Sequence, residues 1–298
     1  MFRSQPRVEL KSREEILLMR RAGLVVADAL DAVRSAARPG LSTADLDAVA
    51  ARSIAAAGAS PSFLGYHGFP ATICTSVDDE VVHGIPGERI LLAGDVVSVD
   101  CGAIVDGWHG DAALTFVLGS DGPLDVDAEP TAALADPADA RLSRVTRTAM
   151  WAGISALAAA RRVGDVGAAV EASVEAATAL GGVPYGIVEE YTGHGIGRAM
   201  HQPPDVLNFR SSDRGPRVRP GLCLAVEPMI TRGGPATREL ADGWTVVTVD
   251  GSRAAHWEHT VAVLDEGIAV LTAHDLGAAG LAPFGVRPVD LDAGAVEG

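Results

Sequence analysis

Cysteine is scarce in this chain, since only Cys74, Cys101 and Cys223 occur among its 298 residues. The three are far apart, lie in apolar strand-like runs and include no C-x-x-C pair. This pattern argues against a framework of disulfides and against a thiolate zinc site. We expect all three cysteines to be reduced residues of the core.

Long apolar segments are missing as well. No run approaches the roughly 18 apolar residues that a membrane helix needs, and the first ten residues, MFRSQPRVEL, lack the apolar centre of a signal peptide. We therefore expect a cytoplasmic protein that does not bind a membrane.

Positive charge is in deficit, because 24 Lys and Arg residues face 39 Asp and Glu residues, which gives a formal net charge of -15. An acidic surface is repelled by nucleic acids and by anionic lipids. We expect no direct binding to nucleic acid, whereas the charge suits the binding of cations.

The residues that are present indicate a globular protein, with 48% hydrophobic and 21% charged residues. Ser12 and Glu15 form a capping box ahead of an apolar pattern with helical spacing, and Pro39-Gly40 ends this helix. A second helix runs from about Ser42 to Gly58. β-rich runs follow, among them ATICTSV and ILLAGDVVSVDCGAIV.

The same order then returns after an acidic, proline-bearing connector at 119–138. A helix is predicted from about 138 to 162 and another after Gly164, followed by strands near GLCLAVEPMI, GWTVVTV and HTVAVL. Adding 124 to the residue number places Gly40 on Gly164, Leu46 on Val170 and Gly58 on Gly182. Such matches also arise by chance in Ala-rich helices. A true duplication predicts two α/β halves with helices behind a sheet and a ligand cleft at their junction.

Two aspartates interrupt the apolar stretch VVSVDCGAIVDGWHGDAALTFVLG at 96–119. Asp106-Gly107 is a hairpin-turn signal, which predicts, to within a one-residue bulge, that Asp100 and Asp111 face each other across the ladder. Two carboxylates this close repel each other strongly unless a cation joins them. The alternative is that both aspartates lie on a solvated face.

Further acids and histidines interrupt other apolar or glycine-rich runs. Glu227 and Glu258 break GLCLAVEPMI and AAHWEHTVAVL, and His194 and His201 lie in EYTGHGIGRAMHQPP. Each alone could be an ion-paired or structural residue, and a phosphate cradle lacks the required lysine. Together, four carboxylates and an imidazole suit Mn, Fe, Co or Zn. Two such ions would neutralise the carboxylates and could activate a water for hydrolysis.

These residues and their surroundings (VDCGAIVDGWHGD, TGHGIGRAMH, VEPMI, WEHT) resemble the methionine aminopeptidases of the pita-bread fold, from about residue 12 to 274. The resemblance implies an α/β (α+β) fold of two pseudo-symmetric halves, in which a curved antiparallel sheet is backed by helices around a central dinuclear metal site. The 31-residue interval from Glu227 to Glu258 is similar to that of the type I class. No cysteine-rich zinc extension precedes the domain, so a bacterial form is implied.

The resemblance also implies a domain organisation and a function. Residues 1–11 would be a short extension, 12–274 one catalytic domain with halves at about 12–118 and 138–264, and 275–298 a loosely packed tail. The enzyme would remove the N-terminal (initiator) methionine from nascent proteins and peptides, and would favour a small second residue. We expect a monomer that meets its substrates at the ribosome.

The resemblance assigns roles to individual residues. The implied ligands of two divalent ions are Asp100, Asp111, His194, Glu227 and Glu258. Glu227 would also act as general base, His83 would lie near the scissile amide, and His201 would hold the substrate carbonyl. The methionine pocket would be lined by Phe63, Tyr66, Phe69, Cys74, Met200 and Trp244, for which core packing is the alternative.

Several positions depart from the family pattern. Ala112 and Ala113 replace Thr-Ser or Thr-Cys, Met200 stands where Phe is common, and His256 stands where Gln usually precedes the aromatic-Glu-His-Thr run. No implied ligand is lost.

Two competing interpretations remain. A proline-specific peptidase of the same fold, aminopeptidase P or prolidase, would carry a sizeable N-terminal domain, and only about a dozen residues precede the first predicted helix. A non-catalytic binding protein on the same scaffold would typically have lost metal ligands.

Overall fold

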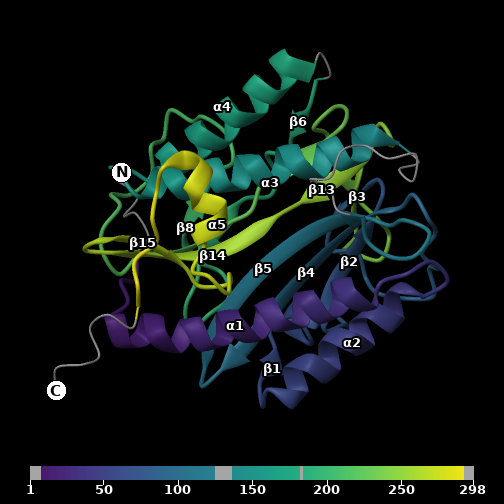
Figure 1. The fold of residues 1–298 in the computed structure, drawn as a ribbon, viewed down its shortest axis with the longest axis horizontal. Helices are drawn as coiled ribbons and strands as arrows, with labels where there is room; N and C mark the ends of the chain where they lie inside the picture. Colours follow the sequence, from purple (N-terminus) through teal and green to yellow (C-terminus); the bar gives the residue numbers. More distant parts are fainter. Residues whose placement is uncertain (1–7, 125–135, 182–183, 292–298) are drawn as a thin grey trace.

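The computed structural model describes residues 8–124, 136–181 and 184–291. Two helix pairs flank a curved sheet: α1 and α2 run below β4 and β5 in the view of Figure 1, whereas α3 and α4 run above β14. The helices are α1 (Arg13–Ala36), α2 (Thr43–Ala56), α3 (Pro137–Leu157), α4 (Gly164–Gly181) and α5 (Ala278–Leu281), with 3-10 turns at Tyr66–Gly68 and Ala282–Phe284.

The main sheet has nine strands in the order β1-β4-β5-β14-β9-β7-β8, with β2 paired to β4 and β15 paired to β14. Two three-stranded sheets, β13-β10-β6 and β11-β12-β3, accompany it. The strands are β1 (Ser60–Pro61), β2 (Ile73–Val77), β3 (Glu80–Val82), β4 (Val96–Val105), β5 (Trp108–Val117), β6 (Gly186–Ile187), β7 (Gly193–Gly195), β8 (Gln202–Val206), β9 (Cys223–Val226), β10 (Met229–Thr231), β11 (Thr237–Glu239), β12 (Val246–Thr248), β13 (Ala254–His256), β14 (Glu258–Leu264) and β15 (Gly267–Val270).

The local signals at the helix ends are confirmed. Ser12 and Glu15 form the capping box of α1, and Ser42 caps α2. Helix α3 ends at Leu157, five residues before the predicted end, because the chain turns there and pairs Arg162 with Arg217 in an antiparallel bridge. All three cysteines are free and buried, as expected.

The segments at the two ends of the chain pack more closely than the sequence predicts. The prediction of a loosely packed tail is wrong for residues 275–291, because Leu281 and Leu291 are buried and Arg13 donates to the carbonyl oxygens of Asp290 and Leu291. In the N-terminal extension, Lys11 is buried and donates to Gln202. Residues 292–298 and most of the 119–138 connector, at 125–135, lie outside the described residues.

The register of β4, β5 and β14 positions three of the predicted ligands. Asp100 pairs with Ala113, and Ala113 pairs with Glu258 on the other side, so these three side chains stand in one row on one face. Asp111 pairs with Gly102 and lies diagonally from Asp100. The prediction that the two aspartates face each other directly is therefore wrong. The loop consists of Asp106 and Gly107 alone, so Asp100 pairs with Ala113, two residues beyond the predicted partner Asp111. A shift of two keeps both aspartates on the same face.

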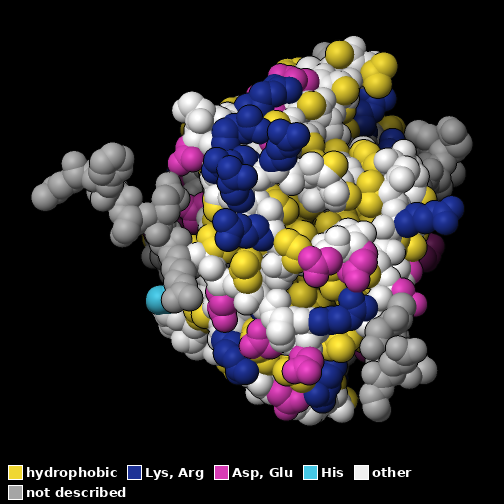
Figure 2. Space-filling model, turned by 90° about the vertical axis from the view of Figure 1, so that its left-hand side faces the viewer, with side chains coloured by type: hydrophobic (Ala, Val, Ile, Leu, Met, Phe, Trp, Pro, Cys, Tyr) yellow, Lys and Arg dark blue, Asp and Glu magenta, His cyan; other side chains and the backbone are white. Residues whose placement is uncertain are grey.

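Charge is unevenly distributed over the surface. Figure 2 shows Lys and Arg side chains gathered in a stripe on one face, above a region of apolar and acidic side chains. Exposed arginines on two paired segments, 161–163 and 216–219, contribute basic side chains to one surface. The net charge of the chain therefore does not describe every face.

Helix α1 packs directly against the sheet at a point where both elements have a glycine. A Cβ atom at Gly23 would lie 2.2 Å from the carbonyl oxygen of Leu271, and one at Gly110 on β5 would lie 2.7 Å from the backbone nitrogen of Gly23. These distances are far below van der Waals contact, so the approach of the helix requires both glycines.

Replacing Gly23 by alanine should destabilise the fold, because the added methyl meets backbone that cannot rotate away. We expect Gly23→Ala to lower the free energy of unfolding by about 1–3 kcal/mol, the usual cost of overpacking, as measured by urea denaturation. Gly87→Ala is the matched control, since its Cβ would have only one neighbour, at 3.9 Å. Equal stability of the two variants would contradict this account of the contact.

Candidate metal centre and active site

The thirteen predicted site residues come together in one place. They line a single cavity of about 130 Å³, to which no other residue of the described ranges contributes lining. The lining residues are Phe63, Tyr66, Phe69, Cys74, His83, Asp100, Asp111, His194, Met200, His201, Glu227, Trp244 and Glu258. The motifs, which are spread over almost 200 residues of sequence, thus form one site.

Four segments supply the five polar residues at one end of this cavity. Asp100 and Asp111 come from the β4–β5 hairpin, His194 from β7, Glu227 from the residue directly after β9, and Glu258 from the first residue of β14. Strand β9 pairs with both β7 and β14, so one hydrogen-bonded ladder fixes the spacing of these groups.

The imidazole of His194 is oriented toward the carboxylates. Its Nδ1 lies 3.0 Å from the carbonyl oxygen of Gly195. Because a carbonyl only accepts, Nδ1 carries the proton and Nε2 presents its lone pair. Nε2 lies 3.3 Å from Oε1 of Glu227 and 4.0 Å from Oδ2 of Asp111. This is the arrangement that a metal-binding histidine adopts.

The electrostatics of the carboxylates show that their charge has to be compensated by protons or by a cation. Burial raises the pKa of Asp100, Asp111, Glu227 and Glu258, and for Asp111 and Glu258 the neighbouring carboxylates raise it further. Burial also lowers the pKa of His194 to about 3, helped by His201. The site therefore holds a neutral imidazole among carboxyl groups that ionise only with difficulty.

Unpartnered buried atoms point to the same conclusion. Oδ1 of Asp100, Oδ1 of Asp111 and Oε1 of Glu258 are buried and have no hydrogen-bond partner within the described ranges. Native proteins leave few such atoms without a reason. Two overlapping sets, Asp111-His194-Glu258 and Glu227-His256-Glu258, have ligand atoms within 4.8 Å of one another. These donors fit divalent ions that accept oxygen and imidazole ligands.

The other end of the cavity is apolar. Phe63, Phe69, Cys74 and Met200 form one buried cluster, against which Tyr66 and Trp244 pack. Phe69 meets Trp244 edge-on at 5.1 Å between ring centroids. A linear side chain that contains sulfur would find aromatic edges and two sulfur atoms here.

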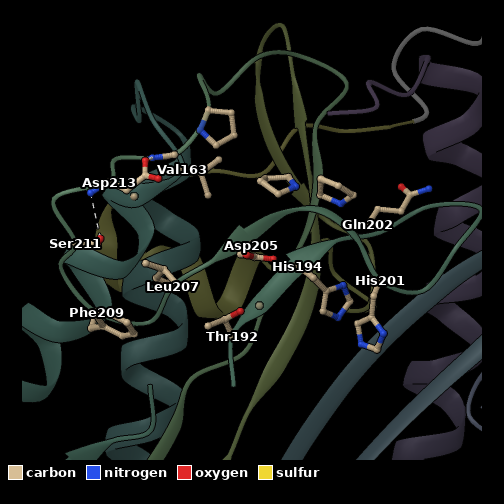
Figure 3. Close-up of a pocket in the computed structure, with 16 residues that line it drawn as sticks. Val163, Thr192, His194, His201, Gln202, Asp205, Leu207, Phe209, Ser211 and Asp213 are labelled. Carbon is tan, nitrogen blue, oxygen red and sulfur yellow. Dashed lines mark hydrogen bonds between the residues drawn. The ribbon is translucent and has the colours of Figure 1, made fainter. Parts of the chain in front are cut away.

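A wider hollow of about 610 Å³ adjoins this cavity and shares His194 and His201 with it. Figure 3 shows the two histidines at one end and Ser211 and Asp213 at the other. Its remaining carboxylates, Asp205 and Asp213, are both exposed, although Asp205 is the cross-strand partner of His194. The smaller cavity, with its converging buried groups, is therefore the stronger candidate for the reactive site.

Comparison with known proteins agrees with this geometry. Residues 17–265 match the model of metallopeptidase family M24. The chain is 51% identical over 266 residues to methionine aminopeptidase 1 of Mycobacterium tuberculosis, which covers 89% of this chain and 95% of the relative. It is 43% identical to the methionine aminopeptidase of Clostridium acetobutylicum, with 88% and 98% covered. The chain belongs to the methionine aminopeptidases of metallopeptidase family M24.

Solved structures place the fold in the same family. The methionine aminopeptidase of Thermotoga maritima has a TM-score of 0.81 and 35% identity, and the match covers 90% of this chain and all of that one. Prolidase from Pyrococcus furiosus has a TM-score of 0.65 at 16% identity, with 89% and 65% covered, and shows the fold alone. The prediction of the pita-bread fold is confirmed. Between Glu227 and Glu258, where every residue is described, the chain forms strands and no helix.

The sequence did not reveal several contacts at this methionine aminopeptidase site. The hydroxyl of Tyr66 lies 2.7 Å from Nδ1 of His201, and the rings of His194 and His201 lie 4.3 Å apart. His256, noted only as a departure from the family pattern, lies beside Glu227. Alternation along an extended chain could have indicated it, because His256 and Glu258 are two residues apart.

Removal of divalent ions should destabilise the protein more at about pH 8 than at about pH 5.5. Unfolded carboxyl groups titrate near pH 4, and the folded pKa values lie higher. In the metal-free protein, these carboxyl groups therefore do not reduce stability below pH 4, and they reduce it increasingly as the pH rises through their folded pKa values. A bound cation cancels this loss of stability. At low pH, protons displace the cation, so its removal has less effect there.

Thermal unfolding with EDTA and with added Mn²⁺, at both pH values, measures this effect. The difference in Tm between the two samples should be larger at the higher pH. An equal difference at both pH values would contradict a buried cluster of carboxylates as the metal site.

Proposed function

We propose that this chain removes N-terminal methionine from peptides and nascent proteins by metal-assisted hydrolysis. The observation that carries the proposal is the juxtaposition, in one cavity, of the buried acid-histidine cluster and an apolar pocket lined by aromatic rings and sulfur. The relatives named methionine aminopeptidase support it at 36–51% identity. No observation favours the proline-specific or the non-catalytic alternative.

The proposed ligands of two divalent ions (Mn, Fe, Co or Zn) are Asp100, Asp111, His194, Glu227 and Glu258. Support comes from the three unpartnered carboxylate oxygens and from the lone pair of His194 that faces them. When bound, such ions lower the pKa of a water and polarise a carbonyl group. Glu227 is the proposed general base, since its carboxylate lies among the proposed ligands, within reach of a water that they would hold.

His201 is the proposed donor to the substrate carbonyl. When the hydroxyl of Tyr66 donates to Nδ1 of His201, the imidazole proton resides on Nε2. Nε2 can then donate a hydrogen bond to a developing oxyanion. His83, whose pKa burial lowers to about 4, is neutral and packs against Trp244 and Tyr191, which suits a neutral hydrogen-bonding group near the scissile amide.

Selectivity for methionine is attributed to the apolar end of the cavity, lined by Phe63, Tyr66, Phe69, Cys74, Met200 and Trp244. The whole cavity, including its polar end, has a volume of about 130 Å³, which admits one side chain but no folded segment. The carboxylates close the opposite end. A chain can therefore enter only with its terminus, which agrees with trimming of a single residue.

The biological setting is part of the same proposal. We place the enzyme in the cytoplasm as a monomer acting at the ribosome, with 12–274 as one catalytic domain whose halves are 12–118 and 138–264. In the described part of the chain, none of the helices has the length and apolar character needed to cross a bilayer. The stripe of Lys and Arg side chains makes one face more favourable to polyanions than the net charge predicts. The expectation of no nucleic-acid contact is therefore tested most directly on that face.

The first measurement is the release of methionine from Met-Ala-Ser by metal-stripped protein titrated with Mn²⁺, Co²⁺, Fe²⁺ or Zn²⁺. We expect metal-dependent release, no release of leucine from Leu-Ala-Ser, and no cleavage of Ala-Pro-Ala. Cleavage confined to the proline peptide would move the chain to the proline-specific alternative, and bound metal without any cleavage would favour a binding protein.

Substitutions should separate ligands from substrate contacts. Asp100→Ala should abolish turnover and lower metal content, whereas His201→Ala should reduce kcat by about 10²–10³-fold with metal content nearly unchanged. His274→Ala, on the surface beside Asp31, is the control. A fully active Asp100→Ala variant would refute the dinuclear centre.

A further inference from the structure

His256 places a second imidazole beside the carboxylates. The residue is 2% exposed, at the end of β13, and its Nε2 has no hydrogen-bond partner among the residues that the structure describes. Nε2 lies 3.6 Å from Oε2 of Glu227. An unpartnered, buried nitrogen at this position requires an explanation.

The backbone geometry turns this side chain toward the site. His256 and Glu258 are two residues apart in extended chain, so both point to the same side. Trp257, between them, points the other way, where its Nε1 donates to Oγ of Ser143. His256 therefore shares the face on which Glu258 meets the other acids.

Two hydroxyl groups fix the backbone of His256. Its N–H donates to Oγ1 of Thr115 at 3.0 Å and to Oγ of Ser98 at 3.3 Å, and the hydroxyl of Thr115 donates to the carbonyl oxygen of His256 at 2.6 Å. Ser98 and Thr115 lie on the hairpin that carries Asp100 and Asp111. The imidazole is thus held in register with the aspartates, as a preorganised ligand would be.

The distance to Glu227 fits a shared ion better than a direct hydrogen bond. At 3.6 Å the two atoms are too far apart for a side-chain hydrogen bond. Nitrogen and oxygen ligands that each lie about 2.1 Å from one ion, and 3.6 Å from each other, subtend an angle of about 120° at the ion, which is an ordinary coordination angle. Each oxygen of Glu227 then faces one imidazole: Oε1 faces His194 and Oε2 faces His256.

We propose that His256 is a sixth ligand of the metal centre, which binds through Nε2 the ion that Glu227 and Glu258 also hold. This inference rests on the ligand set of the proposed function and adds one imidazole to it, which raises the average from half an imidazole to one per ion. The glutamine that the family pattern usually has at this position offers an amide, a harder donor. The exchange favours borderline ions such as Zn²⁺ or Co²⁺ over Mn²⁺.

The test counts imidazoles directly. Wild-type protein, His256→Gln and the control His109→Gln are stripped of metal and loaded with two Zn²⁺ per chain. His109 is half-buried, bonds to Ser62 and is absent from the lining of the cavity. X-ray absorption at the zinc edge should give an average of one imidazole per ion in wild type and control, and half an imidazole in His256→Gln. Calorimetric titration should show one ion weakened by more than the ~100-fold that loss of an outer-shell partner can cause.

Each outcome decides the question. Half an imidazole per ion in wild type would overturn the proposal and leave the proposed function intact, because activity is assayed separately on Met-Ala-Ser. The proposal would also be overturned if His256→Gln bound each of the two ions as tightly as the wild type does. If His256→Gln does not fold, the count in wild type alone still decides. Failure of the wild type to bind any Zn²⁺ would overturn the metal centre as a whole.

Discussion

The mutual repulsion of four buried carboxylates is the constraint around which this molecule is arranged. Two unit charges 4 Å apart cost about 4 kcal/mol even at an effective dielectric constant near 20. A few such pairs rival the 5–15 kcal/mol that stabilises a typical domain. The fold therefore tolerates these acids together only when protons or cations compensate their charge; the four are Asp100, Asp111, Glu227 and Glu258. A protonated carboxyl group can no longer act as a base or bind a metal, whereas a cation leaves all four groups ionised.

The sheet provides the rigidity that this arrangement needs. Asp100, Ala113 and Glu258 stand in one row across three paired strands, and the methyl group of Ala113 leaves room between the two acids. Behind the sheet, α1 approaches so closely through Gly23 and Gly110 that the backbones of the helix and the hairpin are in direct contact. The ladder and the packed helix therefore set the backbone positions from which these acids project.

The sequence was sufficient to nominate thirteen residues that the structure places around one cavity. The four acids could be found because each interrupts an apolar run, whereas the assignments of the histidines and the aromatic residues depended on the family resemblance. The sequence was insufficient for their exact geometry. The offset of Asp100 and Asp111 depends on which two residues form the hairpin loop, and a shift of one in the assumed midpoint moves the pairing by two. The burial of Leu281 and Leu291 depends on contacts with distant elements, which local periodicity does not report.

The departures from the family pattern divide according to the face on which they lie. Ala112 points into the core formed with α1 and α2, where a small apolar residue needs no further explanation. Ala113 and His256 both border the carboxylates, the first between Asp100 and Glu258 and the second beside Glu227. Relative to the family pattern, the chain has a methyl group at Ala113 in place of a hydroxyl or thiol, and an imidazole at His256 in place of an amide. At the apolar end of the cavity, the one departure noted is Met200. Two of the departures, Ala113 and His256, therefore lie at the polar end of the cavity, and one, Met200, lies at its apolar end.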